Sequence, residues 1–321
     1  MSDDAVDAFE RPAHATAARQ ALAAARPDGT VVDSTVLGRG NRKRTVVVRF
    51  RKRPPVVVQS SGASAALRSE AALLEAIRDR TAVPVPPVLA VAAVDGVVSL
   101  VTPRLDGADF HERFVALDPA VRRRVARSLG RYLAALHEAF SFDGYGRLTA
   151  DSDSLSVDGE ASWPEWLAAY GRAAVDRLPA VFDSVRPGLE SLLSERPPRT
   201  EPTARLFPWD FRPGNALVAD GEVTALLDWE APLAAGPALS VAKAEYLVAD
   251  WYVDDPAPLR SAFVDGYGAV RAYPEPAPVH RAVAIADSAV DSTGEVTRPG
   301  YPECGVEEAT AFHRRALAAL L

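Results

Sequence analysis

Cysteine is nearly absent from this chain of 321 residues, in which Cys304 stands alone. A single thiol can form no internal disulfide and no cysteine-based metal cluster. The five histidines lie far apart and lack the HExxH spacing of a zinc site on a helix, so we expect no catalytic zinc. No stretch approaches the roughly 18 consecutive apolar residues of a membrane helix, so we expect no membrane span and no membrane partner.

Basic side chains are fewer than acidic ones, and nearly all of them are arginine. The chain has 36 basic and 43 acidic residues, a formal net charge of −7, and lysine only at positions 43, 52 and 243. Nonspecific binding of nucleic acid needs a basic surface that neutralises phosphates, so we expect no nucleic-acid partner. The stretch "MSDDAVDAFERP" is acidic and lacks the basic-then-apolar pattern of a secretory signal, which favours a cytoplasmic protein.

The first hundred residues combine β-branched runs with two helix patterns. At 48% hydrophobic and 25% charged, the composition is that of a soluble globular protein. The runs "TVLGRG", "TVVVRF", "PPVVVQ" and "VVSLVTP" are separated by turn-forming residues, which predicts an antiparallel sheet. An Ala-rich helix is expected at 13–26, and the stretch "ALRSEAALLEAIRDR" predicts a second helix at 66–80.

From about residue 108 onward the pattern is helical. Apolar residues recur at helical spacing over 121–140, and further helices are expected at 163–178, 238–253, 258–270, 278–290 and 306–320. The stretch "FDGYGRLTADSDSLSVDGEAS" is rich in Gly, Asp and Ser and is interpreted as a loop. We therefore predict an α+β fold, with a small antiparallel β-sheet and one main helix in residues 1–104. A larger helical region containing a β-hairpin is expected in residues 105–321, after a short hinge near "VTPRLDG".

The segment "GNALVADGEVTALLDWE" predicts that hairpin, because an Asp-Gly pair between two apolar runs is a strong signal for a two-residue turn. With Asp220 and Gly221 in the turn, Asn215 faces Leu226, and Asp228 lies on the same sheet face as Asn215 and diagonal to it. Such diagonal neighbours are roughly 7–8 Å apart. Oxygens of Asn215 and Asp228 can then reach one Mg²⁺ ion, whose ligand distances are about 2.0–2.1 Å.

A third oxygen-bearing side chain, Asp210, precedes Asn215 by five residues across a tight turn at Pro213 and Gly214. This spacing places a carboxylate beside the expected metal pair, as a base or orienting group for an attacking hydroxyl. Asp and Asn also cap turns, so each residue taken alone has a purely structural interpretation. Together, and followed by "DWE", they favour a functional site.

Two features of the first hundred residues bear on function. Glu70 falls on the apolar stripe of the 66–80 helix, where a carboxylate needs a partner unless it bends out to solvent. The loop "LGRGNRKRT" can lay the backbone N–H groups of Gly38, Gly40 and Asn41 against a phosphate. The same loop is equally compatible with an ordinary exposed basic turn.

These motifs resemble those of the aminoglycoside phosphotransferase family, which is related to choline kinases and more distantly to protein kinases. The resemblance covers about residues 30–275 and includes the glycine loop, "RSEAALLEAI", "VPVPPVLA", "VSLVTPRLDG", "LGRYLAALHEAF", "SWPEWL", "DFRPGN" and "LLDWE". It implies a protein kinase-like two-lobed fold that uses ATP and Mg²⁺, with Asp210 as the catalytic base and Asn215 and Asp228 as Mg²⁺ ligands. Glu70 would be the partner of a phosphate-binding lysine. The nucleotide-binding residues that the resemblance implies are Gly38, Gly40, Asn41, Gln59, Glu70, Thr102 and Arg104.

The chain departs from the family pattern at two important places. Pro208 and Trp209 stand where relatives carry His and Gly before the catalytic Asp, and Gln59 stands where relatives carry the phosphate-binding lysine. The loss of the lysine is the weightier departure, because a unit-charge pair at about 4 Å and an effective dielectric constant of about 20 is worth up to about 4 kcal/mol. If the transition state bears that whole loss, the rate falls by about three decades. The candidates for a replacement cation are Arg42, Lys43 and Arg44.

The predicted function is an ATP- and Mg²⁺-dependent transfer of the γ-phosphoryl group to a hydroxyl of a small molecule, of the sugar, amino-sugar or amino-alcohol type. The alternative is a pseudokinase, a nucleotide-binding regulatory or scaffolding module without turnover, which Gln59 and Pro208 favour. The acidic stretch at 143–160 and the residues around "ADWYVDD" can attract a cationic acceptor, or be a solvated loop and plain core. The oligomeric state and the role of residues 275–321 stay open.

Overall fold

The computed structural model describes residues 9, 11–37, 43–151, 154–160, 162–195 and 201–321 of the chain. Contacts between residues divide them into two compact units. The first unit comprises the described residues within 1–107, 148–156 and 225–231, and the second comprises those within 108–147, 157–224 and 232–321. Among the helices so described, none is long and apolar enough to cross a membrane.

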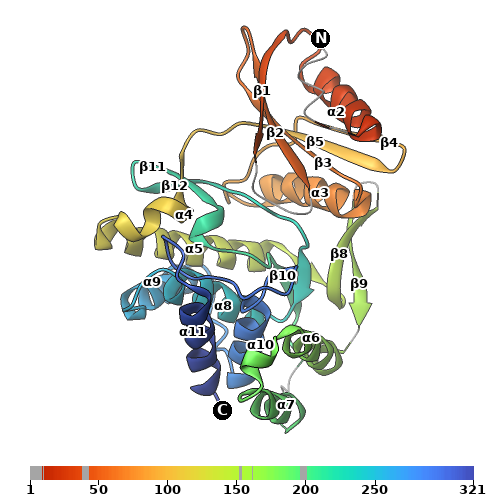
Figure 1. Cartoon of the computed structure of the whole chain (residues 1–321). Coiled ribbons are helices and arrows are strands. Elements are labelled where there is room, and N and C mark those ends of the chain that lie inside the picture. Colours follow the sequence, from red (N-terminus) through yellow and green to blue (C-terminus); the bar gives the residue numbers. More distant parts are fainter. Residues whose placement is uncertain (1–8, 10, 38–42, 152–153, 161, 196–200) are drawn as a thin grey trace. The chain divides into compact units, whose positions relative to one another are not determined.

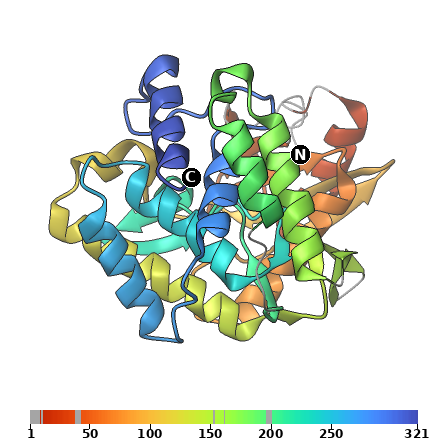
Figure 2. The same ribbon diagram turned by 90° about the horizontal axis from the view of Figure 1, so that it is seen from below.

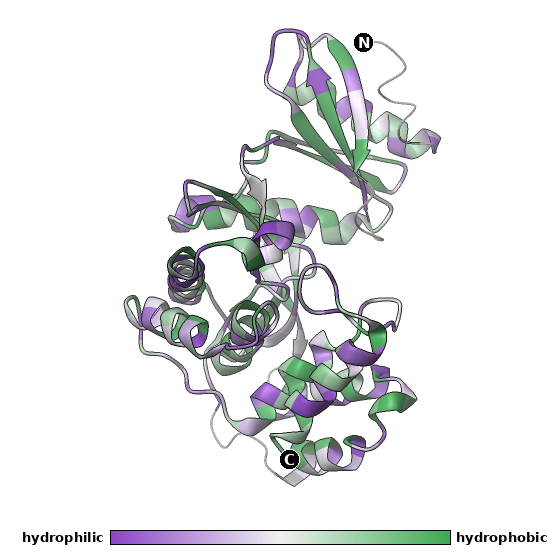
Figure 3. Ribbon diagram, turned by 60° about the vertical axis from the view of Figure 1, so that its left-hand side comes forward, coloured by the Kyte–Doolittle hydropathy of each residue, from purple (hydrophilic) through white to green (hydrophobic). Residues whose placement is uncertain are grey.

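A five-stranded antiparallel sheet forms the centre of the first unit (Figure 1). In spatial order its strands are β1 (Val31–Leu37), β2 (Arg44–Phe50), β3 (Val56–Ser61), β5 (Val97–Pro103) and β4 (Ala90–Val94). These strands are largely apolar, as the green ribbons of Figure 3 show, because β-branched residues fit a pleated and buried surface. The predicted strands are confirmed. Strand β4 was not predicted, and it joins β5 through Asp95 and Gly96, whose φ angles of 47° and 78° suit a two-residue hairpin turn.

Two helices, α2 (Pro12–Ala25) and α3 (Ser64–Arg80), pack against this sheet. Nδ1 of His14 in α2 lies 3.0 Å from the Ser60 hydroxyl, so α2 covers the sheet face to which Ser60 points. Buried alanines and Leu22 of α2 form a core there with valines of β2, β3 and β5. Because successive strand residues point to opposite faces, Gln59 points away from α2.

Helices make up most of the second unit, and α5 (Pro119–Ala139) and α9 (Ala257–Gly268) pack closely against each other. Glycine permits this approach: a Cβ at Gly130 would lie 2.0 Å from the carbonyl oxygen of Phe263. A π-helical turn at Tyr246–Asp250 follows α8, and α10 packs against α6 and α8 (Figure 2). The other helices of this unit are α4 (Phe110–Arg113), α6 (Trp163–Arg177), α7 (Arg186–Glu195), α8 (Pro237–Glu245), α10 (Pro278–Ser288) and α11 (Val306–Ala318).

The predicted helices are confirmed to within a few residues, except that the one expected at 238–253 changes to the π-helical turn after α8. Helix α7 was not predicted. Short 3₁₀ turns lie at Phe114–Ala116, Ala180–Phe182 and Pro213–Asn215.

The remaining strands form two small sheets. One has the order β7-β10-β13-β8-β9, and the other has the order β12-β11-β6. Their bounds are β6 (Ala108–Asp109), β7 (Ser141–Phe142), β8 (Tyr145–Asp151), β9 (Ser154–Glu160), β10 (Ala204–Phe207), β11 (Ala216–Ala219), β12 (Glu222–Leu226) and β13 (Leu233–Ala235).

The hairpin of β11 and β12 is confirmed, since Asp220 and Gly221 have φ angles of 54° and 78°, as its two-residue turn requires. The loop predicted at 142–162 is wrong, because most of that stretch forms β8 and β9. Strand β8 pairs with β13, where Leu233 faces Arg147 and Ala234 faces Gly146. Such partners far along the chain cannot be read from local composition. As a whole, the predicted α+β fold is confirmed, with an antiparallel sheet in the N-terminal part and helices in the C-terminal part.

Candidate functional site

Within the first unit, charged side chains from three segments meet around one ammonium group. Lys43 directly precedes β2, and its Nζ lies 3.0 and 2.9 Å from the two carboxylate oxygens of Glu70 in α3. The same Nζ lies 3.1 Å from Oδ1 of Asp228 and 3.8 Å from Oε2 of Glu230, in the segment after β12. Lys43, one of the three candidates for the missing cation, thus contacts the carboxylate that needed a partner.

This cluster carries three carboxylates around one ammonium, and it is partly shielded from water. The exposed fraction of the side chain is 11% for Lys43, 4% for Glu70 and 40% for Asp228. Burial alone would lower the pKa of Lys43, but the carboxylates of Glu70 and Asp228 outweigh it and raise that pKa, so the ammonium stays charged at neutral pH. Burial raises the pKa of Glu70, and the Lys43 ammonium offsets part of the rise. Asp228 is the most exposed of these three groups and can accept a further cation.

The turn that carries Asp228 has an unusual backbone. Asp228 has φ of 60° and Ala231 has φ of 54°, in the left-handed region that residues with side chains rarely adopt. The Leu226 N–H donates to the carbonyl of Pro84 at 2.7 Å, and the Trp229 indole N–H donates to the carbonyl of Leu226 at 2.9 Å. A hydrogen bond from the Trp229 backbone to Glu70 also ties this turn to α3. Such backbone conformations persist only where surrounding contacts hold them, and they concentrate at functional sites.

Gln59 lies on β3, opposite Thr45 of β2 and Leu100 of β5. Lys43 comes two residues before Thr45, so Lys43 and Gln59 belong to the same sheet face. The Lys43 ammonium therefore reaches Glu70 from the start of β2, rather than from position 59 on β3. This explains how the chain can carry glutamine on β3 and still pair the helix carboxylate.

Two other residues expected around a nucleotide, Thr102 and Arg104, lie at the end of β5 and just after it, and their role stays a prediction. Thr102 is buried on β5 opposite Val57, on the sheet face that Gln59 shares. Arg104 follows β5, is exposed, and donates its backbone N–H to the carbonyl of Pro55 at 3.0 Å. The expected phosphate-binding glycine loop, with Gly38, Gly40 and Asn41, lies outside the described residues, so its role stays a prediction.

Within the second unit, Asp210 and Asn215 meet in the turn between β10 and β11. The Asp210 carboxylate accepts from Nδ2 of Asn215 at 2.9 Å, and from Nε of Arg212 at 3.0 and 3.1 Å. Nδ2 of Asn215 also donates to the Asp210 carbonyl at 2.9 Å, which closes the turn. Because the amide nitrogen faces Asp210, the amide oxygen Oδ1 faces away, and oxygen is the atom of Asn that can bind a metal.

The expected metal pair is divided between the two units, since Asn215 belongs to the second and Asp228 to the first. That both bind one Mg²⁺ ion therefore stays a prediction. In the described part of the chain, no group of three or more His, Cys, Asp and Glu side chains is arranged to hold a metal by itself. Mg²⁺ commonly takes one or two protein carboxylates and completes its shell with waters and substrate phosphates, so a sparse ligand set is compatible with it.

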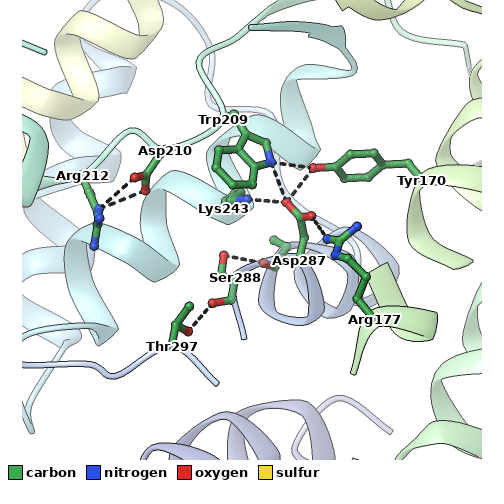
Figure 4. A network of polar contacts seen from close by, with 10 residues as sticks. Tyr170, Arg177, Trp209, Asp210, Arg212, Lys243, Asp287, Ser288 and Thr297 are labelled. Carbon is green, nitrogen blue, oxygen red and sulfur yellow. Dashed lines mark hydrogen bonds and ion pairs between the residues drawn. The ribbon is translucent and has the colours of Figure 1, made fainter. Parts of the chain in front are cut away.

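A buried polar network behind Asp210 was not foreseen from the sequence. Trp209 has φ of 30°, and its indole N–H donates to Oδ2 of Asp287 at 2.9 Å and to the hydroxyl of Tyr170 at 3.1 Å (Figure 4). Asp287 also forms ion pairs with Lys243 and Arg177. The signal available in the sequence was the rarity of lysine, because one of its three lysines lies in the apolar stretch "ALSVAKAEYLVA".

Among the residues considered for a cationic acceptor, the aromatic side chains are buried, whereas the carboxylates of Asp143, Asp158, Glu160, Asp254 and Asp255 are exposed. Trp251 and Tyr252 are each 5% exposed, which favours the structural interpretation over an open stacking wall. Asp250 is paired with Arg260, whose Nη2 lies 2.9 and 2.8 Å from its two carboxylate oxygens. These contacts favour a structural role for Trp251, Tyr252 and Asp250.

Comparisons with known proteins bear on the family and the fold of the chain. A family model described as "Phosphotransferase enzyme family" matches residues 11–279. The apo structure of a thermostable mutant of aminoglycoside phosphotransferase APH(4)-Ia is 16% identical, over 91% of this chain and 94% of that one, with a TM-score of 0.62. A ternary complex of a mutant of the same protein with AMP-PNP and hygromycin B is 16% identical, over 91% and 94%, with a TM-score of 0.58.

A third solved structure is that of the apoenzyme of macrolide 2'-phosphotransferase MphH from Brachybacterium faecium. It is 18% identical, over 94% of this chain and 96% of that one, with a TM-score of 0.57. A comparison with curated proteins found no match. At these identities the solved structures show a shared fold, and a fold alone does not specify a substrate.

Proposed function

Because the chain belongs to the phosphotransferase enzyme family, we propose that it transfers the γ-phosphoryl group of ATP to a hydroxyl of a small molecule, with Mg²⁺ as the metal. The acceptor class that we propose is a sugar, an amino sugar or an amino alcohol. A structural neighbour was crystallised with the ATP analogue AMP-PNP and the antibiotic hygromycin B, which supports a nucleotide and a small acceptor on this fold.

The observation that carries the proposal is the contact of the Lys43 ammonium with both Glu70 and Asp228, at 2.9 and 3.1 Å. Phosphoryl transfer requires positive charge beside the phosphates, and a lysine held by a helix glutamate is one way in which kinases supply it. Lys43 offers this charge even though position 59 is glutamine. A protein that had lost nucleotide chemistry would have no need to keep a buried ammonium beside the exposed carboxylate of Asp228.

In the proposed reaction the acceptor oxygen forms a bond to the γ-phosphorus while the bond from that phosphorus to the leaving oxygen of ADP breaks. Asp210 orients the acceptor hydroxyl and accepts its proton, which then passes to solvent. Arg212 and Asn215 hold the Asp210 carboxylate in place. When bound, Mg²⁺ would neutralise charge on the phosphates, with Asp228 and Oδ1 of Asn215 as its protein ligands.

The test is a screen of metabolite hydroxyls with Mg²⁺ and ATP, in which the phosphorylated product is identified by its mass. The Asp210→Asn variant is the blank, because it preserves the shape of the turn and loses the base. A product that appears with the wild type and is absent from the blank supports the proposal. ADP formation without a phosphorylated acceptor would count against it.

A pseudokinase is the second candidate, and the observation that favours it is the absence of lysine from β3, where Gln59 stands. The two candidates are separated by thermal shift with and without Mg²⁺ and ATP, followed by the same screen. Stabilisation by the nucleotide with no product across a broad panel would favour the pseudokinase.

A further inference from the structure

Trp209 adopts a backbone conformation that its side chain does not favour. Its φ of 30° lies in the positive range, which glycine adopts readily and in which a bulky residue is strained. Strain of this kind costs on the order of 1–3 kcal/mol and persists only where other contacts hold it. Trp209 directly precedes Asp210, so whatever holds Trp209 also determines the direction in which the Asp210 side chain leaves the backbone.

Three groups hold the Trp209 side chain. Its indole N–H donates to Asp287 at 2.9 Å and to the Tyr170 hydroxyl at 3.1 Å, and the Tyr170 hydroxyl donates to Asp287 at 2.6 Å. The ammonium of Lys243 lies 4.1 Å from the centre of the indole ring, a cation–π contact. Figure 4 shows these side chains converging from α6, α8 and α10 on the indole.

The network is buried, and its one carboxylate is paired with two cations. Lys243 and Asp287 are each 3% exposed and form an ion pair, and Arg177 pairs with the other oxygen of Asp287. The Tyr170 ring is itself stacked on Trp166 of the same helix, at 4.8 Å between ring centres. Hydrogen bonds to charged groups in such surroundings are among the stronger ones in proteins, so this network can hold a strained residue.

We infer that Asp287, Lys243 and Tyr170 are positioning residues: through the Trp209 indole they hold the turn that carries Asp210. The segment after residue 275, for which the sequence suggested no role, would thereby contribute Asp287, which helps to hold the Asp210 turn in place. The consequence for catalysis rests on the proposed function, whereas the positioning of the turn does not.

The test compares three variants by hydrogen exchange of the amides in residues 209–215, with α11 as the internal reference. Trp209→Phe keeps an aromatic ring over Lys243 and loses the indole N–H. Tyr170→Phe removes the hydroxyl, one of the two acceptors of that N–H. Arg177→Gln is the matched control, because it removes a contact of Asp287 that does not touch Trp209. We expect exchange in 209–215 to accelerate about tenfold in the first two variants, which corresponds to about 1.4 kcal/mol, and to stay near the wild-type rate in the control.

Exchange at the wild-type rate in both Trp209→Phe and Tyr170→Phe would overturn the inference. So would an equal acceleration in Arg177→Gln, because the effect would then be general destabilisation. Where an acceptor is identified, Trp209→Phe should also lower kcat about tenfold and leave the KM for ATP unchanged. A wild-type protein that yields no phosphorylated product, with the exchange result as expected, would refute the proposed function and leave the positioning intact.

Discussion

Replacing Lys43 with glutamine removes a positive charge that lies 2.9 Å from Glu70 and 3.1 Å from Asp228. At an effective dielectric constant of about 20, each contact corresponds to about 5 kcal/mol of Coulomb attraction. Asp228 is 40% exposed, so water screens most of its share, whereas Glu70 is 4% exposed and would be left as a buried, unpaired carboxylate. Removing one partner of a buried ion pair costs about 3–5 kcal/mol, and we expect Lys43→Gln to lower the free energy of unfolding by about that amount at neutral pH.

The loss should depend on pH, and its direction follows from Glu70. Burial raises the pKa of Glu70 even beside Lys43, and it raises that pKa further when the ammonium is gone. A folded-state pKa above the unfolded value of about 4.3 gives stability at low pH that is lost as the pH rises. The deficit of Lys43→Gln should therefore be small near pH 4 and large at pH 7. The raised pKa of Lys43 keeps the wild-type ammonium charged up to at least about pH 10.5, the unfolded value.

The assay is urea unfolding at both pH values, followed by intrinsic fluorescence. The double variant Lys43→Gln/Glu70→Gln should recover most of the loss, because no buried charge is left unpaired. Lys52→Gln, at an exposed lysine in the turn after β2, is the matched control and should leave the stability unchanged. Equal losses at pH 4 and pH 7, or a double variant no more stable than the single one, would refute the pairing of Lys43 with Glu70.

The same variant bears on the proposed function. If the Lys43 charge acts on the phosphates, its loss should lower kcat by up to about three decades. Adding Gln59→Lys should restore part of that activity, since position 59 lies on the same sheet face. Unchanged turnover in Lys43→Gln would show that the catalytic charge comes from elsewhere.

Three further outcomes are expected. Gly130→Ala should destabilise the protein by about 1–3 kcal/mol or more in urea unfolding, because the new Cβ would lie 2.0 Å from the Phe263 carbonyl oxygen. Gly268→Ala is the control and should leave the stability unchanged, because the space around its Cβ is open. Equal losses in the two variants would contradict the close packing of α5 and α9. Burial lowers the pKa of His137 to about 3, below its value of about 6.5 in the unfolded chain. The unfolded chain therefore binds a proton that the folded protein does not, and the free energy of unfolding should decrease as the pH falls from about 6.5 to about 3. His137→Asn should flatten this slope by up to about 1.4 kcal/mol per pH unit, and an unchanged slope would refute the prediction. Asp228→Asn should weaken the Mg²⁺ dependence of ATP binding in titration calorimetry, and an identical Mg²⁺ dependence would remove Asp228 from the metal site.

Much of the local structure could be predicted because short-range chemistry decides it. The helical spacing of apolar residues over 121–140 specifies a buried face whatever it packs against, and α5 begins and ends within two residues of that range. The Asp-Gly pair at 220 and 221 forms its turn because only a few residue types accept positive φ at both positions. The spacing of Asp210 and Asn215 likewise brings those two side chains together through a turn that needs no distant partner.

The strands β8 and β9 were missed because their stretch is rich in Gly, Asp and Ser, and because β8 pairs not only with its neighbour β9 but also with β13, which lies far along the chain. A strand whose stability comes from such a partner carries little signal in its own composition. Distant partners also explain why the sequence showed Trp209 only as a departure from the family pattern beside Asp210. Its partners Asp287 and Tyr170 lie 78 and 39 positions away in the sequence.

The sequence by itself therefore determined most of the helices, the hairpin, the Asp210 turn and the need of Glu70 for a cation, since each rests on contacts within a few residues or on the cost of burying a charge. It left three candidates for that cation. Only the tertiary structure decided in favour of a contact from Lys43, at 2.9 Å from Glu70, because the packing of α3 against the sheet determines which side chain arrives there. It likewise decided that Asp287, near the end of the chain, lies behind the Asp210 turn, since a buried charge is placed by partners from several elements.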